Sequence, residues 1–545
     1  MPEFRPMNVV KRHSLAMHPG DSWHLAHWYE APREDPAVPE VYTYTDAISY
    51  APGAEVAFHT STTASRWTLQ IYRDGAKPTL VHEAKDLPGS FHKMPDKAYA
   101  RGCNWPSGYR WQIPPDLASG FYRVVSSCAF DSGASFVQHH FFVVTPSMEK
   151  PEGRFLLILP TSTWLAYNDW GGANSYDGVD GPEANQFSPT LSIERPWTRG
   201  LVWLPPGAPR LSDPIKRPAW EAPRYYTKEW AYTNGFAQFF ASAGWAQFDR
   251  HFVVWAEREG YAFDVITQTD LHNHPEILSR YRLGVIVGHD EYWTTEMRDT
   301  VDAFVDAGGK MARFAGNFLW QVRFEDGGKR QVCYKARAHA EDPVKGPLLS
   351  GAWEDPKIGR PGALTFGVNG LQGVYSSWGA FIPRASRGFT VYRPAHWAFD
   401  GTESHYGDVI GGDAGIFAYE VDGLDYTFRK GLPYPTGDDG APASIEILAM
   451  APAVRVEEEH AGEGFRYYIG NGRADSTTSA KPQGASAEAT TKDPQRYGSG
   501  MVVSMKRGKG EVFCAGSCEW LMGLARGDFV TEQVTRNVLN RFLGS

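Results

Sequence analysis

The sequence predicts an α/β protein in which an all-β N-terminal domain precedes a doubly wound parallel sheet. Two observations support this prediction. Over residues 41–150, short segments rich in β-branched and aromatic residues are separated by Gly, Pro and Asp, a pattern typical of strands and turns. Over residues 151–545, continuous apolar runs of strand length alternate with amphipathic helical patterns, which is typical of a parallel sheet covered on both faces.

The N-terminal part divides into an arm and a β-domain. Residues 1–40 are rich in Pro and His and have little periodicity, so we expect an extended N-terminal arm. Several short strands in succession over residues 41–150 predict an immunoglobulin-like β-sandwich. We expect this sandwich to end in the polar stretch 146–154 and to serve stability, assembly or access to the site rather than catalysis.

The rest of the chain, residues 151–545, has the pattern of a flavodoxin-like or glutamine-amidotransferase-like domain. Helices are predicted at 252–260, 294–309 and 531–543, and Gly308 should end the second of them. The segments that we expect to form strands are 154–160, 261–267, 283–288, 310–316 and 501–517.

Three insertions are expected within this domain. Residues 198–235 are rich in Pro and Trp and predict a long ordered insertion. Residues 345–470 predict loops and a small β subdomain that lies over the sheet. Residues 473–496 are polar and poor in hydrophobic residues, which predicts a mobile surface loop.

Composition and charge exclude several classes of protein. The 545 residues are 42% hydrophobic and 21% charged, so a large buried core is available. The net charge of −9, without a long basic run, gives no support to a nucleic-acid or membrane partner. Neither an apolar leader nor an apolar run of membrane-spanning length is visible, so we expect a cytoplasmic protein. Five scattered cysteines without a CxxC pair argue against a disulfide framework or a zinc ribbon.

The predicted strand ends indicate where a site would lie. Ligands of doubly wound sheets bind beyond the carboxyl ends of the strands, at the switch point. We therefore expect the polar and aromatic segments after four predicted strands to converge on one crevice. These segments are 161–178, 289–293, 317–323 and 516–520.

Two of these segments contain candidate metal ligands. His289 and Glu291 are two residues apart in an extended segment and can face one ligand. The alternative is that Glu291 is an N-terminal helix charge and His289 a loop histidine with ordinary partners. Tyr167 and Tyr176 flank a Gly-Gly turn, where tyrosines commonly pack or donate hydrogen bonds. Two phenolates and a carboxylate would nevertheless suit a hard, highly charged cation such as Fe(III) better than zinc.

Other catalytic motifs are absent from the sequence or lack support. No GxSxG, HExxH, P-loop or GxGxxG is present. His272 and His274 have an H-x-H spacing without further ligands, so a polar loop is the favoured interpretation. Cys514 and Cys518 are expected to be buried small hydrophobic residues rather than nucleophiles.

Eight motifs, in order, resemble the large catalytic subunit of N,N-dimethylformamidase and its superfamily over roughly residues 150–545. The motifs are AYNDWGGANSYDG, ERPW, WAEREGYAFDVITQTDLH, GHDEYW, AGNFLW, HWAFDGT, AYEVDG and AGSCEW…TRNVLNRF. The resemblance implies a hydrolase of N,N-dialkylformamides that contains a mononuclear non-haem iron held by two tyrosines and one glutamate. On this chain the first tyrosine is Tyr167, the glutamate is Glu291 and the second tyrosine is Tyr176. Tyr225 and Tyr226 are the alternatives for the second tyrosine, because the spacing from Tyr167 to Tyr176 is short.

The resemblance also implies four catalytic residues, which are His289, Asn317, Glu420 and Lys335. His289 would accompany Glu291, and either Glu420 or His289 would act as general base. Asn317 would hold an oxyanion or orient a water, while Lys335 is matched by position alone. Fe(III) would act as a Lewis acid in a hydrolytic reaction. The pocket should be kept apolar by Trp170, Trp293 and Trp320.

The expected function is therefore metal-dependent hydrolysis of the C–N bond of small N-alkylated amides similar to N,N-dimethylformamide. A homo-oligomer or a hetero-oligomer with a small partner subunit is expected. Two alternatives stay open: a non-catalytic or carbohydrate-associated binding protein, and a superfamily hydrolase with a different metal and substrate. Metal content and the visible absorbance of phenolate bound to Fe(III) would separate them.

Overall fold

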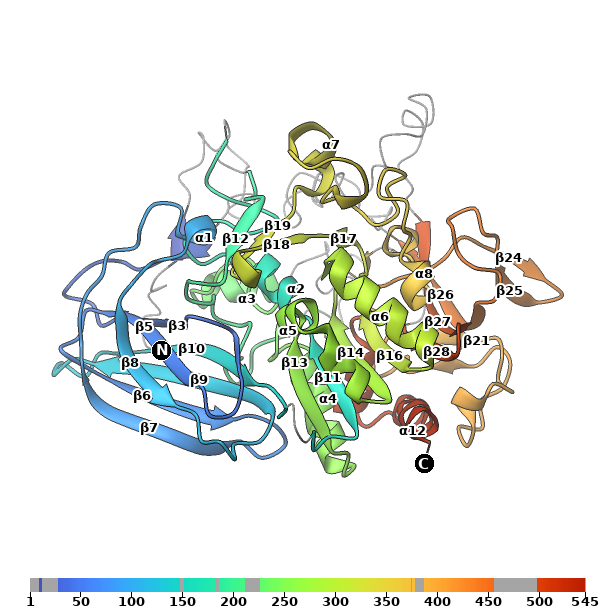
Figure 1. The fold of residues 1–545 in the computed structure, drawn as a ribbon, viewed down its shortest axis with the longest axis horizontal. Coiled ribbons are helices and arrows are strands. Elements are labelled where there is room, and N and C mark those ends of the chain that lie inside the picture. The colour runs from blue at the N-terminus through green and yellow to red at the C-terminus, as the bar shows by residue number, and fades with distance from the viewer. Residues whose placement is uncertain are drawn as a thin grey trace, which may run out of the picture.

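The structure is a computed structural model that describes residues 9–11, 28–147, 151–181, 186–210, 226–373, 375–377, 387–454 and 497–544. Figure 1 shows a β-rich N-terminal domain beside a larger domain that is built around one long sheet. The predicted insertion at 473–496, most of the predicted arm and Tyr225 lie outside the described residues, as does the side chain of Tyr226.

The N-terminal domain consists of two packed sheets. One sheet has five strands in the order β4 (Ser49–Tyr50), β10 (Ser135–Val144), β9 (Gly120–Ala129), β6 (Arg66–Arg73) and β7 (Thr79–Pro88). The other has three, in the order β3 (Val41–Thr45), β5 (Glu55–Thr62) and β8 (Ser107–Gln112). Side chains of both sheets share one core, in which Phe58 of β5 and Phe142 of β10 meet edge to face. The described elements of this domain are strands, with the short helix α1 (Ala98–Arg101), in agreement with an all-β class.

The larger domain contains a nine-stranded mixed sheet. Its parallel part has the order β13 (Phe263–Thr267), β11 (Phe155–Leu159), β14 (Leu283–His289), β16 (Lys310–Gly316) and β28 (Gly510–Cys514). Its antiparallel part continues with β27 (Tyr497–Arg507), β26 (Glu446–Val454), β21 (Phe389–Val391) and β22 (Val409–Ile410). The predicted apolar runs therefore form neighbouring parallel strands.

Two predictions about this sheet are wrong. The sheet is mixed rather than wholly parallel, because β27 and β28 are joined by a tight turn, and such a short connection permits only antiparallel pairing. The strands of the 345–470 insertion do not all form a separate subdomain over the sheet, since β21, β22 and β26 extend the sheet itself.

Helices cover both faces of the large sheet (Figure 1). In β11, Leu157 and Leu159 belong to a core cluster with α4 (Asp249–Arg258), α11 (Trp520–Arg526) and α12 (Phe529–Leu543). The alternate residues Leu156 and Ile158 belong to a second cluster with α5 (Gln268–Asn273), α6 (Thr295–Ala307) and α8 (Ala363–Phe366). This division follows the two-residue period of a strand that is buried on both faces.

The boundaries of α6 agree with the sequence prediction. The Thr294 side chain accepts a hydrogen bond from the Met297 amide and caps the helix N-terminus. Gly308 follows the last helical residue with φ of 121°, a conformation that residues with a Cβ rarely adopt. None of the helices in the described part of the chain is long and apolar enough to cross a membrane.

Smaller elements accompany the sheets of five, three and nine strands. They are β1 (Val9–Lys11) with β2 (Trp28–Glu30), β12 (Thr190–Ser192) with β19 (Arg330–Val332) and β18 (Arg323–Glu325), β15 (Tyr292–Trp293) with β17 (Trp320–Gln321), β20 (Tyr375–Ser377) with β23 (Tyr419–Glu420), β24 (Tyr426–Arg429) with β25 (Leu432–Pro435), and the helices α2 (Thr161–Tyr167), α3 (Tyr226–Thr233) and α7 (Ala338–Glu341).

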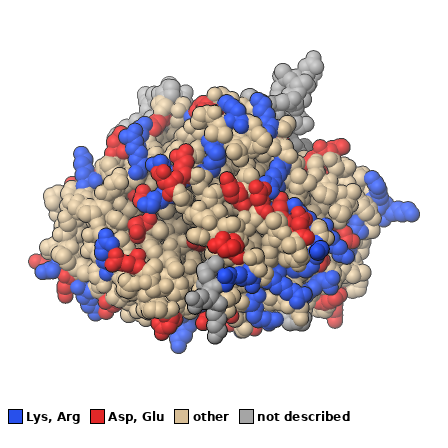
Figure 2. All heavy atoms as spheres, viewed as in Figure 1, with Lys and Arg blue, Asp and Glu red and all other residues tan. Residues whose placement is uncertain are grey.

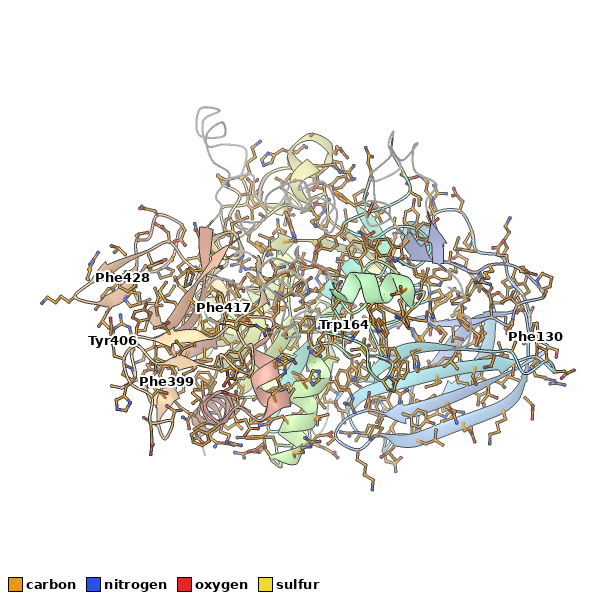
Figure 3. The ribbon with its side chains drawn as sticks, turned by 180° about the vertical axis from the view of Figure 1, so that it is seen from behind. Phe130, Trp164, Phe399, Tyr406, Phe417 and Phe428 are labelled. Atoms are coloured by element: carbon orange, nitrogen blue, oxygen red, sulfur yellow. The ribbon has the colours of Figure 1, made fainter. Side chains whose placement is uncertain are left out.

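The two domains pack directly against each other. Asp74 of the N-terminal domain accepts hydrogen bonds from Trp245 Nε1 at 3.0 Å and from Arg250 Nε at 3.1 Å. The rings of Phe121 and Trp245 are stacked with centroids 3.9 Å apart. Trp164 of α2, labelled in Figure 3, lies between the two domains, and its ring meets Phe121 with centroids 6.1 Å apart. On the face shown in Figure 2, acidic and basic side chains are interspersed among the described residues.

Candidate active site

Three neighbouring parallel strands carry the candidate residues at their carboxyl ends. Strands β11, β14 and β16 lie side by side, and His289 at the end of β14 pairs in register with Gly316 at the end of β16. The segments that follow these strands therefore meet at one edge of the sheet, as expected for a parallel arrangement. Tyr167 ends α2 after β11, Glu291 follows β14, and Asn317 follows β16.

Glu291 lies at the centre of a buried hydrogen-bonding group and is 1% exposed. The Tyr176 hydroxyl donates a short hydrogen bond to Glu291 Oε2, and Trp320 Nε1 donates to Oε1 at 2.8 Å. The Tyr292 hydroxyl donates to the Tyr176 hydroxyl at 2.9 Å. Burial, followed by the nearby Glu291 charge, raises the pKa of Tyr176 well above its ordinary value. A cation among these oxygens would act in the opposite direction, because positive charge favours the phenolate.

Tyr167 completes a set of three oxygen-bearing side chains with Tyr176 and Glu291. Its ring centroid lies 4.4 Å from that of Tyr176 and 5.0 Å from that of His289. Tyr167 is 3% exposed, and its hydroxyl is hydrogen-bonded to the neighbouring Tyr419. The three residues expected to hold a metal are thus brought together.

The imidazole of His289 lies between two carboxylates. Its Nδ1 donates to the Ser242 carbonyl at 3.0 Å, while Nε2 lies 2.5 Å from Glu420 Oε2 and 3.4 Å from Glu291 Oε2. Burial opposes a charge on this ring, but the two carboxylates outweigh burial and raise the pKa of His289 to about 10. The alternative of an ordinary loop histidine therefore does not describe His289, which bridges Glu291 and Glu420.

The side chains of Asn317 and Glu420 are in direct contact at the site. The Asn317 side-chain amide donates a short hydrogen bond to Glu420 Oε2 and lies 3.3 Å from His289 Nε2. This contact orients Glu420. The expectation that Asn317 holds an oxyanion stays a prediction. Gly316 has no room for a Cβ, which would meet the Cys518 amide nitrogen at 2.5 Å and the Glu420 carbonyl at 2.6 Å. The close packing of these backbones brings together the segments that contain Gly316, Glu420 and Cys518.

Lys335 also lies at the site. Its side chain is buried, its Nζ stands 3.6 Å from the ring centroid of Tyr176, and it donates to the Ser175 carbonyl at 3.3 Å. Lys335, Asn317 and Tyr419 have φ values of 53°, 67° and 62°. Positive φ is costly for residues with a Cβ, and such strain is concentrated at functional sites in proteins.

A buried charge network supports the site from the other side of β14 and β16. The guanidinium of Arg313 in β16 binds Asp290 at 2.8 Å and Asp422 at 2.7 Å, and all three side chains are fully buried. Asp422 also accepts from the Phe318 amide at 3.0 Å. Asp290 is the residue between His289 and Glu291. The network therefore ties the segment after β14 to β16 and to the segment that contains Asp422. This network was not predicted from the sequence, although an arginine within the apolar run KMARFAG was a visible signal.

The loop between the two tyrosines folds back on itself. Arg195 of the ERPW motif is fully buried and donates to the carbonyls of Asn168 at 2.7 Å and Ala173 at 3.5 Å. Asn174 Oδ1 accepts from the Tyr176 amide at 2.8 Å. The short spacing between the two tyrosines is therefore compatible with contact between their rings, because Arg195 and Asn174 close the loop.

Some of the remaining candidates lie elsewhere. Trp320 lies at the site, as expected, and its Nε1 donates to Glu291, but Trp293 donates to Asp290 at 2.6 Å on the opposite face of the sheet. Trp170 packs edge to face on Trp105 in the N-terminal domain. The expectation that Trp170 and Trp293 line the pocket is therefore wrong, since their strands or loops turn them away.

The two histidines of the H-x-H pair have different surroundings in the structure. His272 Nδ1 lies 2.9 Å from Thr294 Oγ1, whereas the His274 side chain is 61% exposed beside Glu276. The two imidazoles have different partners, and His272 lies in α5 rather than in the expected polar loop.

The fold and the site together define an α/β protein with a buried cluster of phenol, carboxylate and imidazole groups at the carboxyl edge of its sheet. The chain belongs to the family described as N,N-dimethylformamidase beta subunit-like, C-terminal, which matches residues 62–535. It is 22% identical over 509 residues to the N,N-dimethylformamidase beta subunit of Alcaligenes sp, covering 81% of this chain and 54% of the relative. It is also 22% identical over 383 residues to the beta subunit from Paracoccus aminophilus, covering 59% of this chain and 42% of the relative.

The chain thus spans about half the length of the curated relatives it matches, with 54% and 42% of their lengths covered. The family resemblance inferred from the motifs is confirmed at the level of the family, and both relatives are named as beta subunits. Among solved structures, murine CRIg matches 19% of this chain at 7% identity with a TM-score of 0.14, which is too low to define a fold.

Proposed function

We propose that this chain is an amidohydrolase that cleaves the C–N bond of small N-alkylated amides, with N,N-dimethylformamide as the reference substrate. The names of its relatives support the hydrolase class and the substrate type. The observation that carries the proposal is the convergence of seven predicted site residues at one buried sheet edge. They are Tyr167, Tyr176, His289, Glu291, Asn317, Lys335 and Glu420.

The donor set fits a mononuclear iron. Tyr176 and Glu291 are in direct oxygen-to-oxygen contact, and Tyr167 packs against Tyr176. Phenolate and carboxylate oxygens are hard anionic donors, which suit a hard cation such as Fe(III). We propose that these three residues hold the iron, which when bound supplies Lewis acidity toward the amide carbonyl or a water.

The remaining site residues divide the proton-transfer work in this proposal. Glu420 accepts a proton from the attacking water and passes it to the departing amine. His289 fixes Glu420 through the 2.5 Å contact from Nε2, and its own orientation is set by the Ser242 carbonyl. Asn317 donates to the same Glu420 oxygen and holds the carboxylate in one rotamer.

Aromatic side chains around the tyrosines favour an apolar substrate. Phe239 lies with its ring centroid 6.1 Å from Tyr167 and 5.7 Å from Tyr176, and Phe248 lies 5.9 Å from His289. Such a lining excludes water and suits N-alkyl groups, while the few polar groups orient the amide. Because the relatives are named as subunits of an enzyme, we also propose that the chain works in an oligomer with itself or with a small partner subunit.

The test combines metal analysis with an amide panel. We expect purified protein to contain iron, to show visible phenolate-to-iron absorbance and to release dimethylamine from N,N-dimethylformamide. Glu420→Gln should lower turnover by about 10²–10⁴-fold, the usual contribution of a general base, and keep the iron. The matched control Glu296→Gln lies on an exposed helix position and should keep full turnover. Protein that is loaded with iron and assayed with its partner subunit, yet hydrolyses no amide of the panel, would contradict the proposal.

A further inference from the structure

Cys518 adds a sulfur donor beside the His289–Glu420 pair. The ligand atoms of His289, Glu420 and Cys518 all lie within 4.8 Å of one another, and all three residues are buried. The Cys518 amide donates to the Glu420 carbonyl at 3.1 Å, so the two backbones are tied together at this point. The sequence alone predicts that Cys518 is a buried small hydrophobic residue rather than a nucleophile.

The spacing of these donors is close to that of a tetrahedral zinc site. Zinc bonds of about 2.0–2.1 Å to nitrogen or oxygen and about 2.3 Å to sulfur place such ligand atoms about 3.3–3.6 Å apart. His289 Nε2 and Glu420 Oε2 are 2.5 Å apart and would separate by less than about 1 Å to admit the ion. The sulfur lies within 4.8 Å of a ring nitrogen of His289 and of a carboxylate oxygen of Glu420, so each of these distances would shorten by up to about 1.2 Å. Side-chain rotation can supply movements of this size.

We propose that His289, Glu420 and Cys518 form a second cation site that takes a soft or borderline divalent ion such as Zn(II) or Cd(II). Thiolate and imidazole donors favour such ions, whereas the neighbouring set of two phenols and a carboxylate favours a hard cation. The two donor sets lie next to each other, because His289 Nε2 is 3.4 Å from Glu291 Oε2. One chain therefore offers two adjacent sites of different chemical preference.

Occupation of the second site blocks the reaction. This consequence rests on the proposed function, in which Glu420 accepts a proton and His289 fixes Glu420. An ion bound to both residues occupies a carboxylate oxygen of Glu420, the proton acceptor, and the imidazole nitrogen through which His289 holds Glu420 in place. Soft divalent cations are thus inhibitors of the iron-loaded enzyme rather than substitutes for its iron.

The experiment titrates the iron-loaded full chain with Cd(II). Thiolate-to-cadmium absorbance in the ultraviolet reports binding without reference to catalysis, and dimethylamine release reports inhibition. We expect one Cd(II) per chain to produce the absorbance and to abolish turnover while iron content stays constant. Cys518→Ser keeps the side-chain size and should weaken Cd(II) binding by more than the roughly 10–100-fold that loss of an outer-shell partner costs.

Cys514→Ala is the matched control. Cys514 is also buried and lies on the same segment, but its sulfur faces Arg313 Nη1 at 3.5 Å. This variant should keep the cadmium absorbance, and Cys518→Ala should lose it as Cys518→Ser does. Unchanged absorbance and affinity in both Cys518 variants would overturn the proposed site, as would a parent protein that takes up no Cd(II). Because the absorbance does not depend on turnover, a chain that binds Cd(II) through Cys518 but hydrolyses no amide would refute the proposed function alone.

Discussion

Replacement of Arg313 by methionine should destabilise the protein more than any replacement at an exposed arginine. The guanidinium is fully buried and binds Asp290 at 2.8 Å and Asp422 at 2.7 Å. Methionine has a similar volume but leaves both carboxylates buried without their cation. Removal of one partner of a buried ion pair costs about 3–5 kcal/mol, and here two carboxylates lose it. Since whole domains are stable by about 5–15 kcal/mol, we expect a large fraction of the free energy of unfolding to be lost.

Arg298 provides a matched control for this prediction. It is also fully buried, but it donates to neutral oxygens, with Thr365 Oγ1 at 2.7 Å and the Arg360 carbonyl at 2.7 Å. Unsatisfied neutral acceptors cost about 1–3 kcal/mol, so Arg298→Met should be the milder substitution. Both variants lose one positive charge and a similar volume, so the loss of the ion pairs with Asp290 and Asp422 would explain the difference between them.

Urea unfolding followed by tryptophan fluorescence measures both variants against the parent. We expect Arg313→Met to lower the unfolding midpoint more than Arg298→Met, and Asp422→Asn combined with Arg313→Met to recover part of the loss. Because Asp290 lies between His289 and Glu291, iron content of the folded Arg313 variant should also fall. An equal or smaller loss in Arg313→Met than in Arg298→Met would refute the attribution of stability to this charge network.

Three further predictions concern the site and the N-terminal domain. Glu291→Ala should remove iron and turnover and leave the protein folded, as judged by elemental analysis and circular dichroism; full iron occupancy would exclude Glu291 as a ligand. Tyr167→Phe and Tyr176→Phe should each weaken or shift the visible iron absorbance, and an unchanged spectrum would exclude that tyrosine. Burial lowers the pKa of His139 and of His140 to about 3. An unfolded histidine has a pKa of about 6.5, so between pH 6.5 and 3 the unfolded chain binds more protons than the folded chain. The free energy of unfolding therefore decreases as the pH falls through this window, by up to about 1.4 kcal/mol per pH unit for each histidine. Alanine at either position should flatten this dependence and leave turnover per bound iron within a few-fold of the parent.

Local sequence patterns predicted the elements that carry the site. The apolar runs that form β11, β14 and β16 are buried on both faces. Their continuous apolar composition predicts this burial. Parallel strands place their carboxyl ends at one edge, so the convergence of the segments after these strands followed from the strand assignments. The ends of α6 were predictable for the same local reason, because Thr294 and Gly308 act within one turn of the helix.

The antiparallel half of the sheet could not be predicted in this way. Strands β21, β22 and β26 are separated along the chain by loops rich in Gly and aromatic residues, and their order in the sheet depends on long-range pairing. Periodicity shows that a segment is buried, but it does not show which strand lies beside it.

Short-range periodicity was enough to predict the parallel strands, the helices α4, α6 and α12, and the sheet edge where His289 and Glu291 lie. Three sets of contacts are visible only in the folded chain: Tyr176 with Glu291, Arg313 with Asp290 and Asp422, and Cys518 with Glu420. These contacts join residues far apart in the chain. Which residues pair depends on packing in three dimensions, because burial makes an unpaired charge or polar group costly. The local sequence around one residue therefore does not identify its distant partner.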